Sequence, residues 1–455
     1  MKLINVLIFT IVIFFGIASF LKLSLMESFI FGLTIILLIQ GMLACLAMLY
    51  SFLKPENLQE VLPPRILYGG GYFRYSLIVP AKNEEAVIRD TIKAMAKINY
   101  PKHLYEVLVV VRNDDLGTIK AVEKEISSLA FAMTDRQEAM TDKVNIRLVK
   151  IDGVIANKAY SLNMGWRCAQ GDIIAVFDAE DEPHPDILKS VDEIFLQKKV
   201  DIVQAGVQLI NVSSNWFSCL NCLEYYFWFK SILPFMSKLG ATPLGGNTVF
   251  FKRKVLVKIR GWDENCLTED ADIGIRASAA GFKTSMIYVE EMATLEEAPA
   301  DEWQFIRQRT RWDQGYLQII LKGDWLKLGN LKHQFLSFYL LIQPIIHQFS
   351  ILGMLSIPLI SLGLKVPLWL AMFSWLPFYF LLIQFGLYFI GLADLKKYYR
   401  LTFSPLLFIY LFIFFVPYQL ILAFSSLRAG FRLFLGVFNW EKTEHFNIHR
   451  TVVTQ

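Results

Sequence analysis

Long apolar segments at both ends of the chain constrain its fold more than any other feature. Residues 3–22 and 29–53 are almost wholly apolar. Each is long enough to cross a hydrocarbon core of about 30 Å as a helix rising about 1.5 Å per residue. No clear small-residue cleavage site follows the first segment, and the second comes at once. Residues 1–53 are therefore predicted to form two transmembrane helices.

Three more apolar segments follow residue 330, at 335–363, 366–392 and 403–427. The first is either one long span or an interfacial helix followed by a span, because it contains polar side chains that are costly in lipid. Residues 331–428 are therefore predicted to be a transmembrane region, followed by a polar tail at 429–455.

Basic residues on both sides of 403–427 give conflicting signals about orientation. They are Lys396, Lys397 and Arg400 before it, and Arg428, Arg432 and Lys442 after it. By the positive-inside rule both groups mark cytoplasmic segments. If 403–427 crosses the membrane once, however, the two groups lie on opposite sides and cannot both be cytoplasmic. A broken or re-entrant segment would remove the conflict, so the whole chain is expected to have four to six spans.

Composition supports a membrane protein with one sizeable soluble domain, at residues 54–330. Of the 455 residues, 55% are hydrophobic and 19% are charged, which is too apolar for an ordinary soluble protein. The net charge of +4 gives no strong bias toward polyanions, so nucleic acid is not an expected partner. Five cysteines give no disulfide framework, and the single CxxC at 219–222 lacks the second ligand pair of a zinc site.

Within 54–330, short apolar strands alternate with helical stretches. The strands are expected at 76–80, 106–111 and 173–177, and the helices at 84–98 and 186–199. This alternation predicts an α/β domain with a mainly parallel sheet. Because the carboxyl ends of such strands line the ligand crevice, residues 80–85, 112–115 and 178–182 are expected along one edge.

Two stretches, 215–239 and 303–323, combine aromatic, basic and apolar residues. Such composition favours amphipathic helices lying in the lipid headgroup layer. The alternative is that both are ordinary core helices.

The acids Asp178, Glu180 and Asp181 crowd the end of an apolar strand. Carboxylates this close repel one another, so a positive charge among them is expected. Hard oxygen ligands suit Mg²⁺ or Mn²⁺, which would in turn hold a diphosphate. The alternative is a solvated acidic turn.

Five further motifs occur in an order found in one known group of enzymes. They are 79-VPAKNEE-85, 112-RNDD-115, 157-NKAYSLNMG-165, 268-TED-270 and 308-QRTRW-312. With membrane segments on both sides, the chain resembles the membrane-embedded glycosyltransferases of family 2, which include cellulose, chitin and hyaluronan synthases. The resemblance covers roughly residues 76–320 and implies a nucleotide-sugar-binding domain of the GT-A type.

The resemblance assigns the donor site. Asp114 or Asp115 would hold the base and ribose, although the usual Asp-Asp-Gly-Ser turn is here Asp-Asp-Leu-Gly-Thr. Lys158 would lie near the diphosphate. Asp178 matches the first Asp of the family's DxD motif, with Glu180 in the second place and Asp181 as a rival metal ligand.

The resemblance also assigns the catalytic and acceptor residues. Asp270 matches the catalytic base, with Glu269 in support. Gln308, Arg311 and Trp312 match QxxRW, in which the Trp stacks on the acceptor sugar and the Arg contacts the diphosphate.

Each of these motifs has a structural alternative. Thr268 with the acids that follow could simply cap a helix, and the QxxRW side chains could be interface anchors. Arg307 and Arg309 are expected to be such anchors.

Two other segments are similar to family features. The loop 244–253 resembles the family's glycine-containing loop near the acceptor, and 440-WEKTEH-445 resembles a tail that follows the last span in some members. This tail is either a gating or capping element over the site or a plain polar tail.

These features together predict an inverting glycosyltransferase that uses a nucleotide sugar, first of all a UDP-sugar, with Mg²⁺ or Mn²⁺. The acceptor is expected to be a growing polysaccharide, made processively and exported. The catalytic domain would face the cytoplasm at the cell's inner (plasma) membrane and contact membrane lipid. The alternatives are a single transfer to a lipid acceptor and a non-catalytic nucleotide-sugar sensor or scaffold. Export or regulation by a second messenger would need a partner subunit.

Overall fold

The computed structural model describes residues 19, 21–53, 72–134, 144–153, 157–240, 243–401, 404–441 and 450. The chain divides into two compact units: Met1–Leu49 with Ile345–Ile390, and Tyr50–Pro344 with Gly391–Gln455. The predicted span at 3–22 lies outside the described residues.

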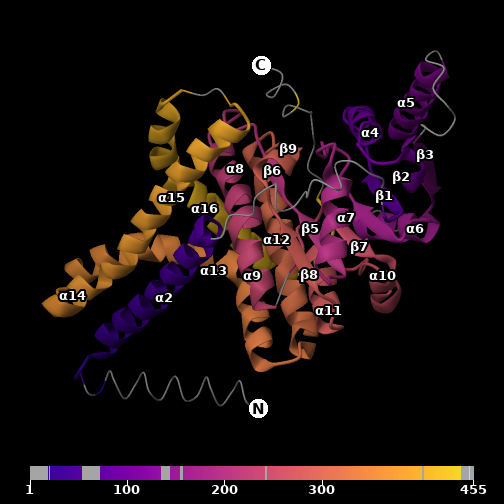
Figure 1. The fold of residues 1–455 in the computed structure, drawn as a ribbon. Coiled ribbons are helices and arrows are strands. Elements are labelled where there is room, and N and C mark those ends of the chain that lie inside the picture. The colour runs from indigo at the N-terminus through magenta and orange to yellow at the C-terminus, as the bar shows by residue number, and fades with distance from the viewer. Residues whose placement is uncertain are drawn as a thin grey trace. The chain divides into compact units, whose positions relative to one another are not determined.

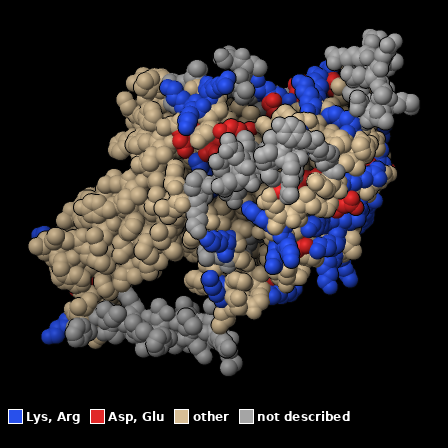
Figure 2. All heavy atoms as spheres, viewed as in Figure 1, with Lys and Arg blue, Asp and Glu red and all other residues tan. Residues whose placement is uncertain are grey.

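The first unit is built from apolar helices, and its surface in Figure 2 is almost free of charged side chains. It contains most of α2 (Leu25–Leu53), the second part of α13 (Leu331–Gly363), α14 (Leu368–Ser374) and the first part of α15 (Leu376–Tyr398). A Cβ added at Gly41 of α2 would lie 2.9 Å from Cβ of Phe380. Glycine therefore allows α2 and α15 to approach closely.

Four helices in the described part of the chain are long and apolar enough to cross a membrane: Leu25–Leu53, Leu331–Gly363, Leu368–Tyr398 and Leu406–Phe434. The segment 335–363 forms one helix, so the single-span alternative holds there.

The last apolar segment is neither broken nor re-entrant. It is the continuous helix α16 (Leu406–Phe434), which accommodates Pro417 and extends past residue 427. Arg428 and Arg432 lie inside this helix, and both pair with Glu441, at 2.8 and 3.3 Å. Because a carboxylate already neutralises them, these arginines are poor indicators of orientation.

The second unit contains a seven-stranded sheet in the order β3-β2-β1-β4-β7-β5-β8. Strands β3, β2, β1 and β4 are parallel neighbours, and β7 is antiparallel to both β4 and β5. The strands are β1 (Tyr75–Ala81), β2 (Tyr105–Arg112), β3 (Asn145–Ile151), β4 (Ile173–Val176), β5 (Ile202–Ala205), β7 (Val249–Lys252) and β8 (Thr284–Ile287). A separate parallel pair joins β6 (Val207–Leu209) to β9 (Thr294–Glu296). The predicted mainly parallel α/β domain is therefore confirmed.

Helices cover both faces of this sheet because successive strand residues point to opposite sides (Figure 1). On one face, Leu77 and Val109 pack with α4 (Ile88–Ala96), α5 (Leu116–Thr134) and α7 (Ile187–Gln197). On the other, Ile78 and Val110 pack with α6 (Lys158–Cys168), α10 (Arg253–Ile259) and α11 (Glu269–Ala279). Short 3₁₀ turns lie at η1 (Lys102–Leu104) and η4 (Glu290–Met292).

The aromatic segment 215–239 forms α8 (Ser218–Phe227), a π-helical turn η3 (Trp228–Ile232) and α9 (Leu233–Leu239). Tyr226 and Phe227 are buried in the protein, as are most positions of α8. This burial favours the core-helix alternative over the predicted position in the headgroup layer. The second such segment forms α12 (Glu302–Lys322), which packs against α16 and is followed by η5 (Asp324–Lys327).

Candidate active site

The site begins at the carboxyl edge of the parallel strands, where the loops after β1 and β2 are tied together. Asp115 is buried and accepts hydrogen bonds from the backbone N–H groups of Asn83 (2.6 Å) and Thr118 (3.1 Å). It thereby caps α5 and holds Asn83 at a φ of 54°. Asp114 is exposed, and a hydrogen bond from Arg112 lowers its pKa. Of the predicted pair, only Asp114 presents its carboxylate outward.

Lys158 opens α6, next to Asn157, whose side chain caps the helix by accepting from the Tyr160 N–H at 2.9 Å. The Lys158 ammonium forms an ion pair with Asp178 at the end of β4 and donates to the carbonyl of Gly246 at 3.0 Å. Burial alone would lower the pKa of Lys158, but nearby carboxylates, first of all Asp178, outweigh it and raise the pKa. The expected counter-charge of the acidic cluster is therefore this lysine.

Asp181 faces the protein interior. Its Oδ2 accepts from the Asp178 N–H at 2.8 Å and its Oδ1 from Asn247 Nδ2 at 2.9 Å. Burial and the neighbouring Glu296 raise its pKa well above the usual range. A buried carboxyl group whose two oxygens already accept hydrogen bonds has little capacity left for a metal ion.

The acids predicted to bind metal do not form a metal cage. Glu180 is also buried. In the described part of the chain, no group of three or more His, Cys, Asp or Glu side chains could hold a metal ion. Asp178 is the most exposed of the three carboxylates, and the assignment of Glu180 or Asp181 as a metal ligand stays a prediction. A single carboxylate still fits a cation that arrives with a diphosphate, because Mg²⁺ is usually held by one or two carboxylates together with substrate phosphates.

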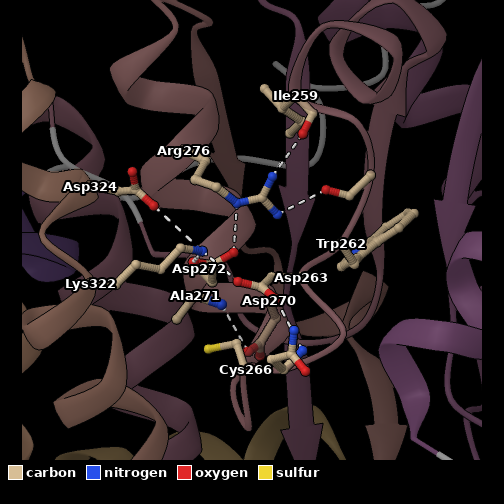
Figure 3. Close-up of polar contacts among 12 residues, drawn as sticks. Ile259, Trp262, Asp263, Cys266, Asp270, Ala271, Asp272, Arg276, Lys322 and Asp324 are labelled. Atoms are coloured by element: carbon tan, nitrogen blue, oxygen red, sulfur yellow. Dashed lines mark hydrogen bonds and ion pairs between the residues drawn. The ribbon is translucent and has the colours of Figure 1, made fainter. Parts of the chain in front are cut away.

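The TED motif lies at the start of α11. Thr268 occupies the N-cap position, but within the described chain its hydroxyl makes no capping hydrogen bond to this helix. The Oδ1 of Asp270 accepts from the Ala271 N–H at 2.8 Å (Figure 3). Simple helix capping by Thr268 therefore does not account for the motif.

Asp270 lies directly against the glycine loop. A Cβ added at Gly246 would be 2.9 Å from Asp270 Oδ2, and Gly246 has a φ of 80°. Both features favour glycine at this position. Burial raises the pKa of Asp270, partly offset by Lys158 and Arg311. Burial and Asp270 raise the pKa of Glu269 to about 7.

The QxxRW motif lies on α12, which Asp301 caps by accepting from the Gln304 N–H at 2.8 Å. The Gln308 Oε1 and Arg311 Nε atoms are buried and have no hydrogen-bond partner among the described residues. The Trp312 ring lies 6.2 Å from that of Tyr225 on α8. The motif therefore offers unused polar groups beside an aromatic pair.

Arg309 was predicted to be an interface anchor, and this is wrong. It forms a partly buried ion pair with Glu224 on α8 and donates to Asn221 at 2.6 Å. Its guanidinium also lies 4.6 Å from the centre of the Trp312 ring. Arg309 therefore fixes α12 to α8 on the side of the helix away from Arg311.

The residues after α16 reach the site. The Trp440 ring lies between Lys82 and Arg311, 5.7 Å from the ammonium and 5.6 Å from the guanidinium. Val437 and Glu441 fix this segment through Gln314 (2.6 Å) and Arg428 (2.8 Å). These contacts favour the capping alternative for Trp440, while residues 442–445 of the predicted tail motif lie outside the described residues.

The structure thus brings Lys158, Asp178, Glu269 and Asp270 together around Gly246, with Arg311 close enough to affect the two TED acids electrostatically. Tyr225 was missed, and no local pattern singles it out. Asn247 and Trp440 lie in the segments 244–253 and 440–445, which the sequence singled out without assigning a role to either residue.

Comparison with known proteins identifies the family of the chain. Residues 73–315, more than half of the chain, match the family described as "Glycosyltransferase like family 2". The chain is 25% identical over 418 residues to a probable glycosyltransferase, YdaM, of Bacillus subtilis, covering 87% of this chain and 90% of that protein. It is 29% identical over 304 residues to the beta-monoglucosyldiacylglycerol synthase of a Nostoc species, covering 65% of this chain and 59% of the synthase.

Among solved structures, the mannosyltransferase PcManGT of Pyrobaculum calidifontis, in complex with GDP-Man and Mn²⁺, has a similar fold. The TM-score is 0.55 and the identity 19%, with 90% of this chain and 99% of that chain covered. The α/β domain therefore has the GT-A type of fold, and the chain belongs to the family 2 glycosyltransferases.

Proposed function

We propose that this chain is an inverting glycosyltransferase in which Asp270 activates an acceptor hydroxyl at the membrane. The observation that carries the proposal is the continuous set Asp178, Lys158, Gly246 and Asp270. Lys158, which pairs with Asp178, donates to the carbonyl of Gly246, and Asp270 lies against the same glycine. Inversion needs a base on the face of the anomeric carbon opposite the leaving diphosphate, and we assign Asp270 to the base and the Lys158–Asp178 pair to the diphosphate.

The raised pKa of Asp270 supports its role as base. A general base works best when its pKa approaches the working pH, and burial moves Asp270 in that direction. Its carboxylate would accept the hydroxyl proton as the acceptor oxygen attacks the anomeric carbon and the bond to the diphosphate breaks.

Positive groups would stabilise the leaving diphosphate. Lys158 stays charged because of the carboxylates around it, and the buried Arg311 Nε has no hydrogen-bond partner among the described residues. A guanidinium suits phosphate oxygens. We assign both side chains to the diphosphate and the exposed Asp114 to the base and ribose. A divalent cation held by Asp178 would, when bound, neutralise charge on the leaving group.

We propose a lipid hydroxyl as the acceptor, in a single transfer. Rings of Phe217, Phe305 and Tyr418 stack at 4.9 and 5.4 Å where α8, α12 and α16 meet, and all three are buried. Tyr418 also donates to Glu224 at 2.6 Å. Such filled packing beside QxxRW favours a single transfer over the passage of a growing chain. The similarity to a beta-monoglucosyldiacylglycerol synthase points the same way.

Processive polysaccharide synthesis is the second candidate. The Tyr225 ring lies 6.2 Å from Trp312 and 6.0 Å from Phe229, and such an aromatic row suits successive sugar faces. Relatives in this comparison also include glucomannan 4-beta-mannosyltransferases, 25% identical over 278 residues in Arabidopsis thaliana. In either case we expect a cytoplasmic catalytic unit, with Lys396 and Lys397 at the end of α15 on that side.

The test is nucleotide release by purified protein in lipid vesicles with diacylglycerol, using UDP- and GDP-sugars with Mg²⁺ or Mn²⁺. Release from one donor with one-sugar lipid product would support the proposal. A long product would favour the polymerase. Silence across the panel despite donor binding would contradict the enzyme assignment and favour the sensor.

A further inference from the structure

One face of α12 is fixed to the segment that precedes and begins the base-bearing helix α11. Gly315, Gln318 and Lys322 lie on this face, because residues three and seven positions apart share one side of a helix. A Cβ added at Gly315 would lie 2.3 Å from Thr268 Oγ1, so only glycine allows α12 to approach the TED motif this closely. This contact lies one turn from Trp312.

Gln318 makes the second contact. Its Oε1 accepts from the Leu267 N–H at 3.0 Å, and its Nε2 donates to the Asn265 carbonyl at 3.2 Å. An amide side chain that satisfies both a donor and an acceptor fixes the backbone just before the TED motif.

Lys322 makes the third contact, and all of its ammonium partners are acids (Figure 3). Its Nζ lies 2.6 Å from Asp272 Oδ1, 2.7 Å from Asp263 Oδ2 and 3.4 Å from Asp324 Oδ2. Asp272 is fully buried, two residues after the predicted base. Its ion pair with Lys322 therefore joins α11 directly to the C-terminal end of α12.

The other oxygen of Asp272 is also bound. Arg276 donates to its Oδ2 at 2.6 Å and also to the carbonyls of Ile259 (2.9 Å) and Gly261 (2.8 Å). The carboxylate thus links α12, the next turn of α11 and the 259–261 turn, as Figure 3 shows. Breaking a buried pair of this kind leaves an uncompensated charge, so its geometry is strongly enforced.

We propose that Asp272 and Lys322 are positioning residues, which set the distance and rotation of α11 relative to α12. This inference rests on the proposed function, because it concerns the place of Asp270 relative to Arg311 and Trp312. Lys322 lies about 15 Å along α12 from Trp312. A small tilt about the Gly315 contact would therefore move the QxxRW side chains relative to the base. A misplacement of about 1 Å can cost about 100-fold in rate.

The test is Lys322→Met, with Lys327→Met as the matched control. Lys327 also pairs with Asp324, at 2.6 Å, but makes none of the contacts to Asp272. With UDP-glucose, UDP-N-acetylglucosamine and GDP-mannose as donors, we expect K322M to lower kcat about 10- to 100-fold per folded protein while changing donor KM less than about threefold. K322R should recover most of the loss, and K327M should match the wild type.

A merely structural role would give a different pattern. In that case K322M would lower the thermal midpoint while the folded fraction kept wild-type kcat, which would overturn the proposal. If wild type were inactive, or D270N kept full activity, the proposed function itself would fail.

Amide hydrogen exchange tests the positioning independently of activity. In K322M we expect faster exchange at Leu267 and Ala271, with unchanged exchange in β1 and β2. Unchanged exchange at both amides would contradict the link between the two helices, whatever the enzyme assay showed.

Discussion

The strand-end cluster, Asp178 to Asp181, and the helix-end cluster, Glu269 to Asp272, each pair a partly exposed aspartate with a fully buried one. The buried aspartates of the two clusters have different partners. Asp181 lies among other acids and is held by hydrogen bonds with a strongly raised pKa, whereas Asp272 is ion-paired with Arg276 and Lys322. The partly exposed acids, Asp178 and Asp270, both face Lys158 and the Gly246 loop.

Within each cluster, burial distinguishes the acids that have a structural role from those that can take part in the chemistry. A buried carboxyl group must be neutralised by protonation or by ion pairs, and either solution occupies its oxygens. Only the partly exposed member of each cluster remains able to meet a substrate. The predictions below test this division.

After Asp270→Asn, which is treated last, the largest effect is expected for Asp178→Asn. Removing the outward carboxylate should lower donor turnover about 100-fold and weaken the dependence on Mg²⁺ or Mn²⁺, because charge on the leaving diphosphate would be less well neutralised. Initial rates across a metal titration measure this. An unchanged metal dependence would show that Asp178 does not hold the cation.

The pH dependence should report the helix-end acids. The base must be ionised, and burial raises its pKa, so the pH range over which transfer increases should lie above that of an exposed aspartate. In Glu269→Gln, the loss of a neighbouring negative charge should move the acidic limb of the profile to lower pH. The measurement is kcat against pH for both proteins. If the acidic limb lies at the same pH in both proteins, Glu269 does not affect the pKa of the base.

Asp181→Asn should preserve the fold and activity at neutral pH, because asparagine has the same size and its amide oxygen can still accept from the Asp178 N–H. The pKa of Asp181 is higher in the folded protein than in the unfolded one. Its contribution to wild-type stability is therefore complete below the pKa of the unfolded state and is lost as pH rises through the pKa of the folded state. The variant should therefore gain a few degrees in thermal midpoint relative to wild type at about pH 8. Loss of stability at every pH would show that Asp181 is ionised.

The smallest effects concern the pair after β2. Asp115→Ala should lower the free energy of unfolding by about 1–2 kcal/mol, since two backbone N–H groups lose their acceptor. Asp114→Ala should leave the free energy of unfolding nearly unchanged, because the side chain is exposed, and should mainly raise donor KM. Denaturant titration and donor kinetics distinguish the two. Equal losses of stability in the two variants would contradict the assignment of a structural role to Asp115 alone.

The sequence predicted the central strands and their neighbouring helices well, because continuous apolar runs and helical periodicity are local signals. Strands at 76–80 and 106–111 lie inside β1 and β2, and the helices expected at 84–98 and 186–199 overlap α4 and α7. The motif residues Lys158, Asp178 and Asp270 do converge in space.

The roles of individual acids and arginines could not be predicted in the same way. Asp178 and Asp181 are the same residue type three positions apart, and only the contacts with Asn247 and Glu296 make one of them interior. Arg309 and Arg311 are likewise the same residue type, and only Arg309 lies on the side of α12 that faces Glu224. Arg428 was misleading because its carboxylate partner, Glu441, lies beyond the end of α16. Such tertiary partners leave no local trace.

The central claim is tested most directly by comparing Asp270→Asn with Asp181→Asn in one assay of nucleotide release, normalised to folded protein. Both substitutions replace an acid by its amide, one at the partly exposed position and one at the buried position. We predict a loss of about 1,000-fold for D270N, within the range for general bases, and a rate within about threefold of wild type for D181N. Comparable losses in both variants, or the larger loss in D181N, would contradict the division between chemical and structural acids.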